Sequence, residues 1–239
     1  MSRILFLGCA GTIEALYKNP LSSAAIMIGV DDVQLIINPG PGTAYNAGRE
    51  KCDLAATDAV LLSSKDLIHM SDLDVIEEIV KHYSPFKEFK KILEHSEHKH
   101  NIKGVEISSI KTKTNETAFL IHTTKFILGY IPKFEYTKKF GEEFRDANIL
   151  VIDCNDEFDK KNMIELIEDV DPELVILSGF GMKMIKEDPL DFSRTLKKEL
   201  QKNKQSPITT QIMPAKDGMQ LNTEHYNIKV KQKSLKGFV

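Results

Sequence analysis

The chain has 239 residues, of which 41% are hydrophobic and 28% are charged. This composition suits a folded α/β protein and excludes an intrinsically disordered chain. The formal net charge of −3 argues against a surface dedicated to nucleic acid. No apolar run approaches the roughly 20 residues that span a membrane. The three cysteines lack disulfide-type spacing, and MSRILFLGCAGT has no signal-peptide core, so we expect a cytoplasmic protein without membrane partners.

Strands dominate the first part of the chain, before the first long helix. A helix is expected from Ser71, because Ser71 and Asp74 are spaced as a capping box ahead of an apolar stripe. A shorter helix is expected at Phe86–Leu93. The segment NPGPGT at 38–43 interrupts regular structure. The strands predicted in this part are Ile4–Leu7, Ala24–Val30, Val33–Ile37 and Asp58–Leu62.

A polar, histidine-rich segment at 93–104 separates this part from a second one with the same order of strands and then helices. The aromatic stripe of Tyr136, Phe140 and Phe144 has helical spacing. Further helices are predicted at Lys160–Val170 and from Asp188, with Pro189 as the first helical residue. The strands predicted here are Val105–Ser109, Ala118–Ile121, Phe126–Ile131, Ile149–Ile152, Leu174–Leu177, Ile208–Ile212 and Tyr226–Val230.

The repeated order predicts two sheets that face each other with helices outside. That arrangement is a four-layer αβ/βα sandwich of the α/β class, formed as a single domain over residues 1–239. No linker rich in glycine, serine or proline divides the chain.

Short motifs occur in order along nearly the whole chain. FLGCAGT, SSAAIMI, IINPGPGT and DAVLLSSKDLIHMSDL come first, and FILGYIPKFEY, ANILVIDCND, LVILSGFGMKMI and PAKDGM follow. This series resembles the landmarks of the metallo-β-lactamase fold, in particular its small prokaryotic hydrolase branch. The resemblance implies the same αβ/βα sandwich and, in active members, a dinuclear metal site that activates water for hydrolysis.

The chain departs from the family pattern at almost every metal-ligand position that the resemblance implies. Only His69 is the residue found in the family, and Asp66 offers a carboxylate in place of an imidazole. A catalytic zinc or iron site needs at least three imidazole, carboxylate or thiolate ligands, so we expect no metal and no other cofactor. The seven positions hold Ser64, Asp66, Ile68, His69, Thr114, Lys133 and Gly179, and Asn38 replaces the aspartate that supports the ligands.

Lys133 places a cation where the family has a bridging aspartate. An unpaired buried ammonium group is costly, so we expect Asp66 and Asp153 to neutralise it. Lys133 would also give the pocket a positive floor that suits a small anionic ligand.

Three functions remain open at this point. The favoured one is a non-catalytic pseudoenzyme that acts as a binding or structural partner, in a homo-oligomer or with another protein. The alternative is a hydrolase, phosphodiesterase-like or thioesterase-like. It would use either a mononuclear metal site or a metal-free triad. The mononuclear site would hold Asp66, His69 and a third donor that the sequence does not place, and Asp153 beside the other two would support it. The triad would have Ser64 as nucleophile, His69 as base and Asp66 to orient the histidine. The third possibility is that the vacated pocket senses a small ligand.

Three further features have a functional and a structural interpretation. His95, His98 and His100 suit a transition metal, although a solvated connection is favoured because no enclosing shell surrounds them. Cys9 is either a reactive thiol or a small buried residue, and the second is favoured. The glycines of the two turns either cradle a phosphate or simply form tight turns.

Overall fold

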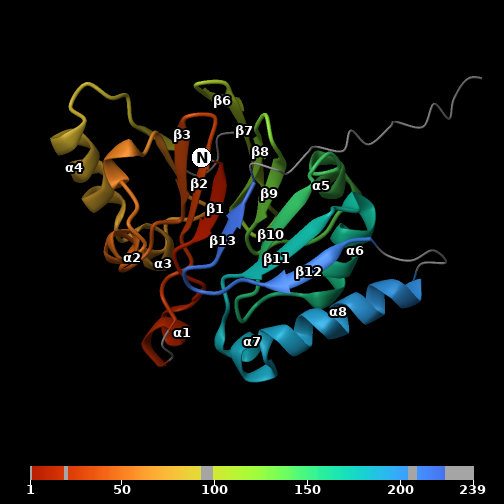
Figure 1. Ribbon diagram of the computed structural model, residues 1–239. Coiled ribbons are helices and arrows are strands. Elements are labelled where there is room, and N and C mark those ends of the chain that lie inside the picture. The colour runs from red at the N-terminus through yellow and green to blue at the C-terminus, as the bar shows by residue number, and fades with distance from the viewer. Residues whose placement is uncertain (1, 19–20, 93–98, 204–208, 224–239) are drawn as a thin grey trace, which may run out of the picture.

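The computed structural model describes residues 2–18, 21–92, 99–203 and 209–223. Two β-sheets face each other, and helices cover their outer sides (Figure 1). The strand order is β13-β1-β2-β3-β4-β5 in the first sheet and β12-β11-β10-β9-β8-β7-β6 in the second. The predicted αβ/βα sandwich is therefore confirmed, whereas the extent of a single domain over residues 1–239 stays a prediction.

The strands follow the long apolar runs of the sequence. In the first sheet they are β1 (Arg3–Phe6), β2 (Ile26–Val30), β3 (Val33–Ile37), β4 (Ala59–Leu61), β5 (Lys90–Ile92) and β13 (Gln220–Asn222). In the second sheet they are β6 (Lys99–Ile102), β7 (Val105–Lys111), β8 (Thr117–His122), β9 (Ile127–Ile131), β10 (Ile149–Asp153), β11 (Leu174–Ser178) and β12 (Gln211–Pro214).

The helices form the two outer layers and the connections at one end of the sheets (Figure 1). They are α1 (Ile13–Lys18), α2 (Thr43–Arg49), the short 3₁₀ helix η1 (Leu54–Ala56), α3 (Leu67–Met70), α4 (Leu73–Tyr83), α5 (Lys138–Glu143), α6 (Lys160–Val170), α7 (Met182–Glu187) and α8 (Pro189–Asn203). The predicted helices at 160–170 and from Pro189 are confirmed.

Alternation along the first sheet divides its side chains between two apolar clusters. Ile4 and Phe6 of β1 belong to the cluster that contains residues of both sheets, whereas Leu5 belongs to a second cluster. That second cluster includes Ala47 of α2 and Ile76 of α4, so these helices cover the outer face of the sheet. The period of two expected for a strand buried on both faces accounts for this split.

Parallel pairing brings the carboxyl ends of several strands to one edge of the sandwich. Strands β3 and β4 are parallel in the first sheet, and β9, β10 and β11 are parallel in the second. Ala10, just after β1, forms bridges with both Ser23 and Phe180 and so joins the two sheets at this edge. In open α/β sheets this edge is where ligands bind.

In the first part, one helix prediction was wrong, and the helix expected from Ser71 is present as α4 but begins without the predicted cap. The segment predicted as a helix at 86–93 forms a turn and then β5, whose buried Ile92 pairs with Leu61 of β4; Leu93 lies outside the described residues. A helix there would leave the parallel edge of β4 without a partner. The capping box is also absent, because α4 begins at Leu73 and the hydroxyl of Ser71 donates to the Leu67 carbonyl.

Strand predictions were wrong where pairing, rather than apolarity, decides the structure. The strand expected at 208–212 is β12, placed three residues later by its parallel register with β11. Strands β6 and β13 were not predicted, and the strand expected at 226–230 lies outside the described residues. Within the described part of the chain, no helix is both long and apolar enough to span a bilayer.

Candidate functional site

The candidate site lies at the edge where the parallel strands end. Asn38 directly follows β3, and Ser63 and Ser64 follow β4. In the second sheet, Asp153 is the last residue of β10 and Gly179 follows β11. Polar or small residues at the ends of four strands therefore lie close together, in the arrangement expected for an α/β active site.

A buried hydrogen-bond chain crosses this site from one sheet to the other. Asn38 Oδ1 accepts from the Ser63 backbone at 2.8 Å, and Asn38 Nδ2 donates to Ser63 Oγ at 2.8 Å and to the Tyr130 hydroxyl at 2.7 Å. The Tyr130 hydroxyl donates in turn to Asp153 Oδ2. Both amide hydrogens of Asn38 are thus used, which suits a side chain that is completely buried. Asn38 has a φ of 50°, a left-handed conformation that asparagine tolerates well.

Asp153 is an unusual carboxyl group because it is nearly inaccessible to water. Its Oδ1 atom has no hydrogen-bond partner in the described part of the chain. Burial raises the pKa of Asp153 to about 7, against the lowering effect of the Tyr130 hydroxyl. Burial, and then the proximity of Asp153, raises the pKa of Glu116 to about 7 as well. A proton on Asp153 near neutral pH therefore costs little.

Ser64, Asp66 and His69 form a second polar group at the end of β4. Ser64 Oγ lies 2.7 Å from His69 Nδ1 and 3.2 Å from Asp66 Oδ2. Burial lowers the pKa of His69 to about 4, with Asp66 opposing the change. The imidazole is therefore neutral at pH 7. The three residues predicted as a triad do meet, but Asp66 is bonded to the serine, whereas a triad places the carboxylate on the imidazole.

Lys133 is not neutralised as the sequence suggested. Its ammonium group pairs with Glu157, and the Lys133 side chain is 33% exposed. The prediction that Asp66 and Asp153 neutralise a buried Lys133 was therefore wrong, because the side chain extends toward the loop that follows β10. Thr114 contacts the backbone of Lys133, because its hydroxyl donates to the Lys133 carbonyl at 2.6 Å.

Ile68 and Gly179 contribute no donor side chain to the site. Ile68 is buried, and its carbonyl accepts from Ser23 Oγ at 3.0 Å. Gly179 has a φ of 57°, and a Cβ atom built on it would lie 2.6 Å from Asp153 Cγ and Oδ1. Gly179 stands at one of the metal-ligand positions of the family, and the carboxyl group of Asp153 fills the space that a side chain there would need.

Comparison with known proteins places this chain in a family. Residues 20–177 match the family described as "Beta-lactamase superfamily domain". The chain belongs to the metallo-β-lactamase superfamily. No curated protein sequence matches the chain.

Solved structures of metallo-β-lactamase fold proteins share the whole architecture at low sequence identity. The fold protein YhfI from Bacillus subtilis is 14% identical, with a TM-score of 0.70 over 92% of this chain and 98% of that one. A diphosphatase from the PhnP family is 15% identical, with a TM-score of 0.64 over 94% and 98%. Yeast PDE1 is 10% identical, with a TM-score of 0.68 over 92% and 99%. At these identities the similarity shows the fold alone.

The donor set of this chain does not fit the dinuclear metal centre of the superfamily. Among the described residues, no group of three or more His, Cys, Asp or Glu side chains is arranged to hold a metal ion. The mononuclear set of Asp66, His69 and Asp153 is thus not formed. Of the histidine-rich segment, only His100 in β6 is described; His95 and His98 lie outside the described residues.

Sequence reasoning missed Tyr130, Ser63 and Glu116 as members of this site. Tyr130 stands within the motif FILGYIPKFEY, but its apolar surroundings indicated only a core strand. Glu116 lies two residues after Thr114 in the turn between β7 and β8, and its charge alone carried no signal. Cys9 is buried beside Asp217, and its pKa is raised by that burial, which agrees with the structural interpretation of this thiol.

Proposed function

We propose that this chain is a non-catalytic member of the metallo-β-lactamase superfamily, a pseudoenzyme that keeps the scaffold and has lost the dinuclear metal centre. The hydrogen-bond chain of Asn38, Tyr130 and Asp153 is the observation that carries the proposal. Tyr130 accepts from Asn38 and donates to one carboxyl oxygen of Asp153, so these side chains are tied to one another at the strand ends where active members need groups free to bind metal.

A pseudoenzyme of this kind acts by binding, either to another protein or to a second copy of the chain. Large apolar side chains at the surface support a protein partner. Tyr17 of α1, Tyr45 of α2 and Leu67 of α3 are 85%, 76% and 71% exposed, and these helices lie at the site end of the molecule (Figure 1). The proposal includes a cytoplasmic location.

Metal content tests the proposal directly. Protein purified without a histidine tag is offered zinc, iron and manganese, dialysed, and measured by elemental analysis. We expect less than about 0.1 ion per chain, because two of the ligand positions have no donor and His69 is bonded to Ser64. A stoichiometric ion that survives dialysis would contradict the proposal, and phosphodiester and thioester substrates would then be tried.

A metal-free hydrolase is the second candidate, favoured by the 2.7 Å separation of Ser64 Oγ and His69 Nδ1. At this distance a histidine base can take the proton of a serine nucleophile. Ser64 Oγ, however, donates its hydrogen bond to Asp66 Oδ2. His69 Nδ1 must then carry a hydrogen and donate it to Ser64 Oγ, so in this tautomer the imidazole cannot act as a base toward Ser64. Esterase activity on p-nitrophenyl acetate that Ser64→Ala abolishes would support this candidate. Activity that is equal in both proteins would exclude it.

A further inference from the structure

A concave surface separate from the candidate site lies between β7 and α5. We call it the lysine groove and define it by Lys99, Lys111, Lys113 and Lys139 with Ser108 and Phe140. Its volume is about 500 Å³, and Ile110, Glu135, Thr137 and Glu143 also line it. Cavities of 300–1,000 Å³ are the usual size for small-molecule sites. None of the residues of the candidate site lines this groove.

The groove carries a net positive charge, whereas the chain as a whole is negatively charged. Four lysines face two glutamates there, although the formal net charge of the chain is −3. Among the described residues, Lys113 is the groove lysine that forms an ion pair, with Glu135 at 2.6 Å. The side chains of Lys99, Lys111 and Lys139 make no hydrogen bond or ion pair within the part of the chain that the structure describes.

The ammonium groups of Lys99, Lys111 and Lys139, which have no ion-pair partner among the described residues, repel each other around one cavity. A bound anion removes this repulsion, since each lysine donates up to three hydrogen bonds to acceptor oxygens. The lysines are not the whole lining. Ile110 and Phe140 add apolar surface, and Ser108 adds a hydroxyl group. A ligand with an anionic group and an apolar ring matches both parts.

We propose that the lysine groove binds a small organic phosphate, with the phosphate on Lys99, Lys111 and Lys139 and the organic part against Phe140 and Ile110. The cavity suits a small molecule better than a nucleic-acid strand, because the groove is confined between a strand and a helix. The proposal is independent of the loss of the metal centre, so either one can fail alone.

The turn between β7 and β8 gives the groove a structural connection to the candidate site. Lys111 and Lys113 line the groove at one side of this turn. Thr117, at its other side, donates its backbone N–H to the Ser63 carbonyl at 2.8 Å. The turn therefore joins the groove to the segment that follows β4 through one hydrogen bond.

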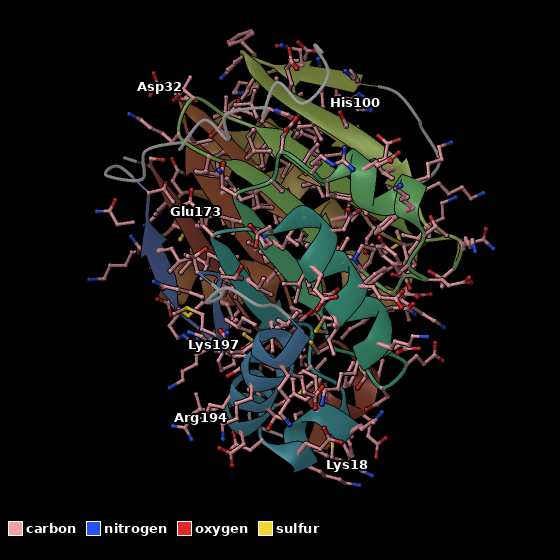
Figure 2. The ribbon with its side chains drawn as sticks, turned by 90° about the vertical axis from the view of Figure 1, so that its right-hand side faces the viewer. Lys18, Asp32, His100, Glu173, Arg194 and Lys197 are labelled. Carbon is pink, nitrogen blue, oxygen red and sulfur yellow. The ribbon has the colours of Figure 1, made fainter. Side chains whose placement is uncertain are left out.

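Isothermal titration calorimetry with adenosine 5′-monophosphate and with phenyl phosphate tests the proposal. The groove variant is Lys111→Gln with Lys139→Gln. The control is Lys197→Gln with Lys198→Gln, which removes the same charge from exposed positions on α8 (Figure 2). In Figure 2, Lys197 lies well away from His100, which neighbours Lys99 on β6.

We expect at least one probe to bind with a Kd below about 1 mM at low salt and to weaken as ionic strength rises. The groove variant should bind at least about tenfold more weakly, with the control within about twofold of the parent chain. Equal urea midpoints would show that all three proteins are folded. Absence of binding by both probes, an equal loss in the control, or stronger binding of a single-stranded oligonucleotide would overturn the proposal.

Discussion

Tyr130 is the residue on which the candidate site depends most, because its hydroxyl is bonded on both sides. It accepts from Asn38 Nδ2 and donates to Asp153 Oδ2, and the side chain is 1% exposed. Replacing the hydroxyl by hydrogen leaves a buried amide N–H and a buried carboxyl oxygen without partners. Each unsatisfied buried group costs roughly 1–3 kcal/mol.

We therefore expect Tyr130→Phe to lower the free energy of unfolding by about 2–4 kcal/mol in urea denaturation. Tyr136→Phe is the matched control, since the Tyr136 hydroxyl is only partly buried and makes a single longer bond, 3.3 Å, to Asp169. The control should lose less than about 1 kcal/mol. Similar losses in the two variants would show that the Asn38–Tyr130–Asp153 chain contributes nothing special.

At the scale of the elements, the turn that follows β11 excludes a side chain at Gly179 for two reasons. The residue has a φ of 57°, and a Cβ would lie 2.6 Å from the Asp153 carboxyl group. Gly179→Ala should therefore lower the free energy of unfolding by more than about 2 kcal/mol. Gly42 is the matched control, because its φ is also positive, at 83°, and no atom lies within 4 Å of its Cβ position.

Gly42→Ala should cost only about 1 kcal/mol, the conformational part of the effect. The difference between the two variants measures the contact with Asp153. If both variants lose the same free energy, Asp153 moves aside easily, and a ligand histidine at residue 179 would then be sterically acceptable. Thermal unfolding by circular dichroism is sufficient for this comparison.

Elements with long apolar runs could be predicted from the sequence, whereas short paired elements could not. Strands such as β10 and β11 consist almost wholly of branched apolar residues, which favour a buried strand. Strands β5, β6 and β13 are rich in lysine, asparagine and glutamine, and they form because a neighbouring strand supplies their hydrogen bonds. No local pattern carries that information.

The same limit applies to the candidate site. The motifs located the strand ends and the changed ligand positions, because those depend on residue order. Partners across the fold depend on side-chain reach, so Lys133 was assigned to Asp66 and Asp153 although it pairs with Glu157. Tyr130 was missed because a tyrosine in an apolar strand is more often a core residue than a member of a polar network.

At the scale of the whole molecule, Asp153 and His69 make opposite contributions to the dependence of stability on pH. The native pKa of Asp153 is about 7, above its ordinary value of about 4, so the folded chain holds the extra proton and loses stability as pH rises from 4 to 7. The native pKa of His69 is about 4, below its ordinary value of about 6.5. Its contribution is present above pH 6.5 and is lost as pH falls toward 4.

These two effects oppose each other in the parent chain, where the raised pKa of Glu116 acts in the same direction as that of Asp153, so single variants are needed to separate them. We expect the free energy of unfolding of Asp153→Asn, relative to the parent, to rise by about 2–3 kcal/mol between pH 5 and pH 8, because the cost of ionising a buried carboxyl is removed. His69→Gln should change in the opposite direction over the same interval. Urea denaturation at the two pH values measures both differences.

Asp146→Asn is the control for the pH experiment, because it removes one negative charge at an exposed position in the turn between α5 and β10. Its difference from the parent should be the same at pH 5 and pH 8. Parallel curves for Asp153→Asn and the parent would mean that water reaches the carboxyl group of Asp153. The candidate site would then be open to solvent, and the proposal that its polar side chains are buried and held by one another would fail with it.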